Sequence, residues 1–178
     1  MDNILFLSSF VFVPLLMLLG LWLARNINQV RGVMVAGSSA LLALAVYLVF
    51  AFLEAREADP VSEMLFTGAV SWFEPLHIKY AVGVDGISVA MLLLSAIIVF
   101  TGTFASWQLK PLTKEYFLWL TLLSMGVFGF FTRRNLLAVL ISTELILNAI
   151  DINFAVFNAY YYPEHLEGFF FTMFAIGI

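Results

Sequence analysis

Cysteine is absent from this 178-residue chain, which excludes disulfides, thiolate metal sites and iron–sulfur ligation by the chain itself. Its two histidines, His77 and His165, are too few for a multi-histidine metal centre or a haem pair. Charged residues make up only 11% of the sequence, and the eight basic ones are scattered. The sequence therefore lacks the cluster of basic residues that is typical of nucleic-acid binding. Phosphate loops, Walker sequences and nucleophile elbows are lacking too. We therefore expect no metal, cofactor or nucleic acid on this chain.

Apolar residues are what the sequence has in excess. They make up 63% of the chain, against about 45–50% in ordinary soluble domains. A protein this small cannot hide so much apolar surface from water, because a large share of a small chain stays exposed. The composition therefore predicts an all-α, polytopic transmembrane protein that sits in a lipid bilayer.

The apolar residues fall into runs of helical length. A run of about 20 residues crosses a hydrocarbon core of about 30 Å. Five runs approach or exceed this length, and we expect each to span: residues 4–24, 32–53, 87–107, 116–131 and 136–157. A sixth run, 168–178, is too short to span, and we interpret it as either a truncation or the start of a span that continues past residue 178. The sequence predicts five to six spans.

Loop charges predict an orientation. Basic residues mark the first and third loops: Arg25, Arg31, Lys110 and Lys114. The second loop, residues 54–85, carries six acids against Arg56 and Lys79. Because basic loops favour the cytoplasm, the first and third loops are expected inside, and the N-terminus and the acidic loop outside.

The turn after the fourth run conflicts with this orientation. Alternation puts it outside, yet it carries Arg133 and Arg134 and no acid. Either the charge rule has one exception here, or the two parts of the chain come from different topological contexts. We expect both arginines to extend to lipid headgroups; pairing with a neighbouring subunit is the alternative.

The acidic loop also has a local pattern. Apolar and polar residues alternate over 72–80, and turn residues follow at 83–86. A period of two is typical of a strand with one apolar face. We expect a short extramembrane β-hairpin between spans two and three, within about 54–86.

Two acids lie inside a predicted span, Glu144 and Asp151. Glu144 is eight residues from the start of the fifth run, a depth of about 12 Å, near the bilayer midplane. With Asn148, these acids fall within about 60° of one another on a helix. Ser142 and Asn153 point the other way, so protein neighbours on more than one side are expected.

An acid at that depth costs about 2.5–3.5 kcal/mol by insertion scales, so it needs a partner, a cavity or a proton. One interpretation is a proton relay through Glu144, with Asn148 holding the carboxyl or a water and Asp151 as a further station. The alternative is that these polar groups only bond helices together. Gly126 and Gly129 permit close helix packing.

Two stretches carry recognisable motifs, and the first contains Gly83-Val-Asp-Gly-Ile-Ser88, a span ending Ala105-Ser-Trp107, and Lys114-Glu-Tyr-Phe117. These motifs resemble the N-terminal part of antiporter-like subunit M (chain 4) of bacterial NADH-quinone oxidoreductase, respiratory complex I. This resemblance covers about residues 1–123. It implies that the first spans and the outside hairpin belong to that family.

From about residue 124 to 178 the sequence resembles subunit K (chain 11) of the same complex. The matching stretches are Gly126-Val-Phe-Gly129, Thr132-Arg-Arg-Asn135, Glu144-Leu-Ile-Leu-Asn-Ala149 and Leu166-Glu-Gly-Phe-Phe-Phe171. The resemblance implies that Glu144 is the buried glutamate which that family uses in proton translocation. Asp151 departs from the pattern, because the family usually has Asn there.

The resemblance implies a non-redox subunit of the proton-translocating enzyme, inactive alone, in a bacterial inner membrane. NADH, FMN, iron–sulfur clusters and quinone would be held by partner subunits or at interfaces with them, and the partners would be other hydrophobic subunits. The change of resemblance makes the chain a mosaic: a natural fusion, an engineered or mis-joined sequence, or fragments of two subunits. Alternative functions are a subunit of a multisubunit cation/proton antiporter and a structural or assembly membrane protein.

Overall fold

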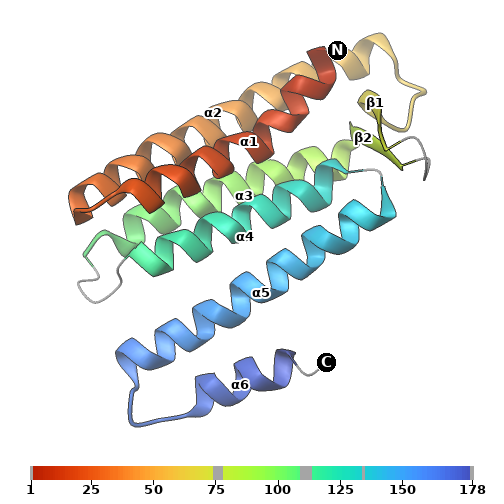
Figure 1. The fold of residues 1–178 in the computed structure, drawn as a ribbon. Helices are drawn as coiled ribbons and strands as arrows, with labels where there is room; N and C mark the ends of the chain where they lie inside the picture. Colours follow the sequence, from red (N-terminus) through yellow and green to blue (C-terminus); the bar gives the residue numbers. More distant parts are fainter. Residues whose placement is uncertain (1, 74–77, 109–113, 134, 177–178) are drawn as a thin grey trace.

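The computed structural model describes residues 2–73, 78–108, 114–133 and 135–176 (Figure 1). The described elements are α1 (Asp2–Leu23), α2 (Ile27–Ala58), β1 (Leu65–Phe73), β2 (Ile78–Val84), α3 (Gly86–Ala105), a 3-10 turn (Ser106–Gln108), α4 (Lys114–Thr132), α5 (Leu136–Tyr161) and α6 (Glu167–Ile176). Helices α1 to α5 are long and apolar enough to cross a membrane. The predicted polytopic helical fold with a small hairpin is confirmed.

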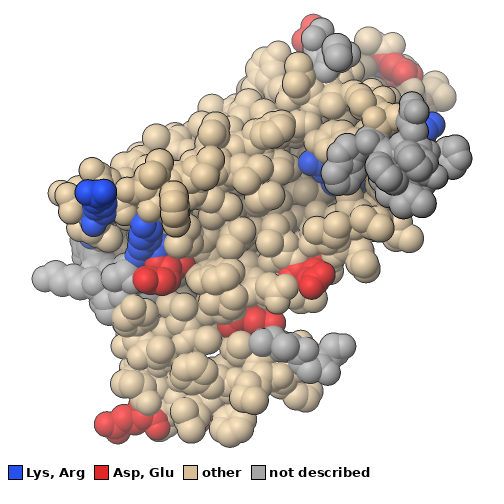
Figure 2. Space-filling model, viewed as in Figure 1, with Lys and Arg blue, Asp and Glu red and all other residues tan. Residues whose placement is uncertain are grey.

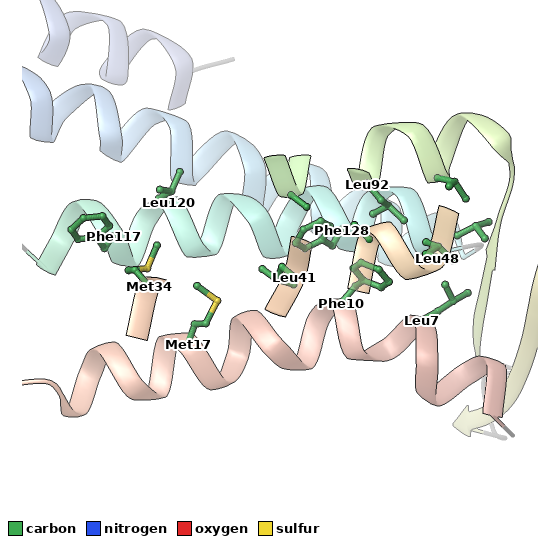
Figure 3. Packing of buried hydrophobic residues seen from close by; sticks show 14 of the residues in the cluster. Leu7, Phe10, Met17, Met34, Leu41, Leu48, Leu92, Phe117, Leu120 and Phe128 are labelled. Atoms are coloured by element: carbon green, nitrogen blue, oxygen red, sulfur yellow. The ribbon is translucent and has the colours of Figure 1, made fainter. Parts of the chain in front are cut away.

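Helices α1 to α4 form a bundle around one apolar core. In that bundle α1 contacts α2 and α4, and α3 contacts α2 and α4. Leu7, Phe10, Leu41 and Phe128 are among its fully buried side chains (Figure 3). The buried cluster draws on α1 to α4 and on β2, but on no residue of α5 or α6. Helix α5 lies against α4, and α6 lies against α5 (Figure 1), so these two helices stand outside the core.

The predicted hairpin exists, but its strands differ from the alternation that predicted it. Strands β1 and β2 pair antiparallel, with Ala69 opposite Ala81 and Phe73 opposite Ile78. The alternating stretch 72–80 is therefore not one strand. It is divided between the two strands, and residues 74–77, which include His77, lie outside the described residues. Alternation alone cannot reveal this, because a period of two does not mark where one strand ends and the next begins.

The hairpin end of the bundle also holds the turn between α4 and α5. Arg133 forms an isolated antiparallel bridge with Val82 of β2. The Asn135 Nδ2 donates to the Lys79 carbonyl oxygen at 3.2 Å. Helix α4 runs unbroken through residues 123 and 124, where the two resemblances meet. Arg133 therefore lies at the opposite end of the bundle from Lys114, and the conflict between alternation and the charge rule stays as the sequence presents it.

The first and third loops meet at the opposite end, as their shared basic character predicts. The Lys114 ammonium donates to the carbonyl oxygens of Trp22 and Ala24 at 2.7 and 3.0 Å. A cation there offsets the unpaired carbonyls at the end of α1. The Arg31 guanidinium donates to the Trp107 carbonyl at 2.6 Å and lies 5.0 Å from the centre of the Trp107 ring. These contacts join the two loops directly.

Asp85 makes the start of α3 sensitive to pH. Its carboxylate accepts a hydrogen bond from the Ser88 backbone N–H at 2.7 Å. Hydrogen bonds from the Ser88 side chain and backbone hold the pKa of Asp85 below its ordinary value of 3.8. Because the folded pKa is the lower one, this stabilisation is present above the unfolded pKa and is lost as pH falls through the folded value.

We expect Asp85→Ala to lower the stability of the folded chain by about 1 kcal/mol at neutral pH, the usual cost of losing an N-cap. The difference from wild type should begin to shrink below about pH 4, where Asp85 of the unfolded chain starts to bind a proton, and should be lost as pH falls through the lower pKa of the folded state. Thermal unfolding in detergent at several pH values measures both effects. The exposed Glu63→Ala is the matched control; equal losses in the two variants would contradict a capping role for Asp85.

Candidate functional site

Helix α5 presents a first face to α4, and the two helices approach closely there. A Cβ built on Gly126 would lie 2.7 Å from Ile146 Cγ1, and one on Gly129 would lie 2.6 Å from Ser142 Oγ. Further along, the rings of Tyr116 and Phe157 meet edge to face at 5.6 Å. The prediction that the two glycines allow close packing is confirmed, and Ser142 faces α4.

A second face of α5 is covered by α6. Asp151 lies there and is 8% exposed. The Thr172 hydroxyl of α6 donates to the Asp151 backbone oxygen at 2.9 Å. Asn158 stabilises the turn between α5 and α6 through two hydrogen bonds. Its Nδ2 donates to the His165 carbonyl oxygen at 2.6 Å, and its Oδ1 accepts from the Gly168 N–H at 2.9 Å. From Asp151 to the end of α5, this face is therefore covered by α6.

Toward the start of α5, the same face is open. Glu144 and Asn148 are exposed on it. The neighbouring apolar side chains are also exposed, with Leu137 at 54%, Leu140 at 67% and Leu147 at 56%. Acidic side chains show at the surface over α5 (Figure 2). In the 18-residue apolar stretch of α5, 11% of the residues are buried, against 44% in the corresponding stretch of α4. Helix α5 therefore exposes more apolar surface than α4.

The predicted site residues share one stripe but not one environment. At about 100° per residue, Glu144, Asn148 and Asp151 project to the same side of the helix. Helix α6 covers this stripe at Asp151 and leaves it open at Glu144 and Asn148. The described residues of this chain do not enclose Glu144, so any protein shell around its carboxyl must come from another helix.

Two asparagines of α5 have environments that the sequence does not specify. The Asn153 Oδ1 is buried without a hydrogen-bond partner among the described residues. Asn158, which holds α6 in place, is missing from the predicted site residues. A polar amide near the end of an apolar run is the signal that could have singled it out. Neither residue lies on the open face.

The described part of the chain contains no group of three or more acidic or histidine side chains that could hold a metal ion. The chemistry available on the open face of α5 is therefore that of one carboxyl and one amide among aliphatic side chains. A carboxyl can bind and release a proton, and an amide can hydrogen-bond it in either state. The arrangement suits proton exchange or a polar contact between helices.

Comparison with known proteins concerns the second part of the chain. Residues 115–178 match the family of the NADH-ubiquinone/plastoquinone oxidoreductase chain 4L. A chloroplast NAD(P)H-quinone oxidoreductase subunit 4L of Trachelium caeruleum is 44% identical over 57 residues, which are 32% of this chain and 57% of the relative. Subunit 4L of Leptolyngbya boryana is 42% identical over 66 residues, 36% of this chain and 65% of the relative.

These matches agree with the predicted resemblance to subunit K, the 4L-type subunit, in the second part. The family match begins at residue 115 and so takes in nearly all of α4, whereas the resemblance to subunit K predicts a start at about residue 124. The chain spans 57% and 65% of the length of the two relatives. These comparisons give no evidence for an antiporter-like first part. The resemblance of that part to subunit M stays a prediction.

Proposed function

We propose that this chain is a membrane subunit of an NADH-quinone oxidoreductase and takes part in proton translocation coupled to quinone reduction. One observation carries the proposal. The segment that resembles chain 4L is the segment in which α5 presents Glu144, within an apolar span, on a face that residues 2–73, 78–108, 114–133 and 135–176 leave open. The subunit itself carries no redox group and is inactive alone.

Glu144 is the proton-carrying residue in this proposal. An ionised carboxylate that faced hydrocarbon would cost several kcal/mol. A partner helix that brings a lysine, an acid or ordered water to the open face removes this cost and gives the proton a donor and an acceptor. Asn148, one turn further along the same stripe, orients the carboxyl through its amide. Asp151 is a further station beneath α6.

The partners in this proposal are other hydrophobic subunits of the complex, and the open face of α5 is where at least one of them packs. NADH, FMN, iron–sulfur clusters and quinone belong to those partners or to interfaces with them. The five apolar helices make the chain a multi-pass membrane protein. A bacterial inner membrane is the location we propose for it.

Purification of a tagged chain from its native membranes tests the proposal. We expect mild detergent to release it together with flavin, iron–sulfur clusters and NADH-oxidising activity. The same membranes without the tag are the control for non-specific capture. Sodium- or proton-driven cation exchange without any redox partner would instead assign the chain to a multisubunit antiporter. Recovery with hydrophobic chains but neither activity would support the structural alternative.

A further inference from the structure

A cavity of about 560 Å³ lies at the hairpin end of the bundle, and neither Glu144 nor Asn148 is among its lining residues. It is lined by the hairpin, by the end of α4 and by the start of α5, with Val11 of α1 completing one side. Its volume falls within the range of about 300–1,000 Å³ that is typical of small-molecule sites. Most of the lining is aliphatic, as in Val70, Met125, Ala138 and Leu145.

Two basic side chains line the same cavity: Lys79 of β2, and Arg133, which directly follows α4. None of the described lining residues is acidic. The Arg133 Nη1 is buried and has no hydrogen-bond partner among the described residues. A buried charged donor without an acceptor is costly, and an anionic oxygen in the cavity would satisfy it.

The guanidinium is held in place by surrounding contacts. It lies 4.0 Å from the centre of the Tyr80 ring, a cation–π contact. The Tyr80 hydroxyl in turn shares a hydrogen bond of 2.7 Å with the Ser8 hydroxyl of α1. The Arg133 backbone pairs with Val82. A cation fixed in this way loses little side-chain freedom when it binds a ligand.

The position of the cavity matches the level of lipid headgroups. Helix α4 ends and α5 begins beside it, next to the hairpin and the N-terminus of α1 (Figure 1). The charged rim thus lies where spans leave the hydrocarbon, and the aliphatic wall of α5 extends from there toward the bilayer centre. Basic pockets between spans at this level suit anionic headgroups.

We propose that this cavity binds an anionic phospholipid. Its phosphate accepts hydrogen bonds from Arg133, with Lys79 beside it, and one acyl chain lies against the aliphatic residues of α4 and α5. Guanidinium binds phosphate through two parallel N–H groups. The lipid fills the gap between the hairpin and α5 and ties the extramembrane sheet to the spans. This site does not depend on the proposed role of Glu144.

The test counts lipids bound to the full chain in its native assembly. After detergent washing, native mass spectrometry follows the rebinding of phosphatidylglycerol and, separately, of phosphatidylcholine. We expect phosphatidylglycerol to bind and phosphatidylcholine to be washed away. Arg133→Gln should weaken phosphatidylglycerol binding about tenfold or more, the loss expected for a charge-assisted hydrogen bond. Arg25→Gln, a basic residue at the far end of the bundle, should bind as wild type.

Two further variants keep the test decisive if Arg133→Gln fails to assemble. Lys79→Gln changes an exposed side chain and should weaken binding. Ala138→Phe keeps both cations, fills the aliphatic part and should also expel the lipid. Equal binding of the two lipids, or displacement of phosphatidylglycerol by glycerol phosphate alone, would overturn the proposal. So would a neutral quinone that binds equally well to the wild type and Arg133→Gln.

Discussion

Glu144→Gln is expected to abolish proton translocation in the assembled complex while NADH oxidation by an artificial acceptor continues. Glutamine keeps the size and hydrogen-bonding ability of glutamate but cannot bind and release a proton. Loss of a positioned proton-transfer group typically costs about 10²–10⁴-fold in rate. Proton uptake by sealed vesicles during quinone reduction measures the effect directly, and the artificial-acceptor assay checks that the redox partners are intact.

Two variants separate a proton role from a merely structural one. Glu144→Asp retains an ionisable group and should keep part of the translocation, whereas a role in bonding helices would make it no better than Glu144→Gln. Glu164→Gln removes an exposed acid from the turn between α5 and α6 and should leave translocation unchanged. Unimpaired translocation in Glu144→Gln would show that Glu144 only makes a polar contact with its neighbour. Infrared difference spectroscopy adds a second readout, since a proton-carrying carboxyl changes its protonation band during turnover.

The spans could be predicted from sequence because lipid imposes a simple rule. Every backbone polar group must be paired within the segment, so a long apolar run becomes a helix regardless of its neighbours. This is why residues 136–157 were expected to form a span, and α5 extends only a turn further, to Tyr161. Boundaries were less certain: α2 runs from Ile27 to Ala58, well beyond the apolar run 32–53. Its charged ends continue the helix outside the hydrocarbon.

The environment of the site residues could not be predicted in this way. Helical periodicity puts Glu144 and Asp151 on one stripe, but only the packing of α6 shows that Asp151 is covered and Glu144 is open. Nothing in the local sequence of either acid carries this information. It depends on Asn158 and Gly168, which fix the turn that brings α6 back along α5.

The lipid cavity illustrates the same limit over longer separations. Its walls combine Val11, Val70, Lys79 and Arg133, residues that no local pattern connects. The sequence did predict that Arg133 would extend to headgroups. What it could not show is that the guanidinium lies over the Tyr80 ring, and that one of its nitrogens is buried with no partner in the described part of the chain. Arg133 is therefore part of the lining of a defined cavity as well as a residue at the membrane interface.

Gly126→Val is expected to separate α5 from α4 and to prevent stable assembly. A Cβ at this position would lie 2.7 Å from Ile146 Cγ1, 3.1 Å from the Ile146 backbone nitrogen and 3.2 Å from the Ser142 carbonyl oxygen. The side-chain contact can relax, but the two backbone atoms cannot move without displacing α5. Overpacking a tight interface costs about 1–3 kcal/mol, and the branched side chain of valine places the variant at the upper end. The yield of assembled complex and its thermal unfolding in detergent measure this loss.

Gly32→Val is the matched control, because a Cβ on Gly32 meets nothing within 4 Å. Both variants replace a glycine with valine in a membrane helix. A difference in their stability or assembly therefore arises from the α4–α5 contact. A double-mutant cycle locates the strain further: Ile146→Ala should partly rescue Gly126→Ala, since it removes the atom that approaches most closely. If Gly126→Val assembled as well as Gly32→Val, the close approach of the two helices would be wrong. The open face of α5 would then no longer be defined, because the packing of α4 against the opposite face is what turns Glu144 outward.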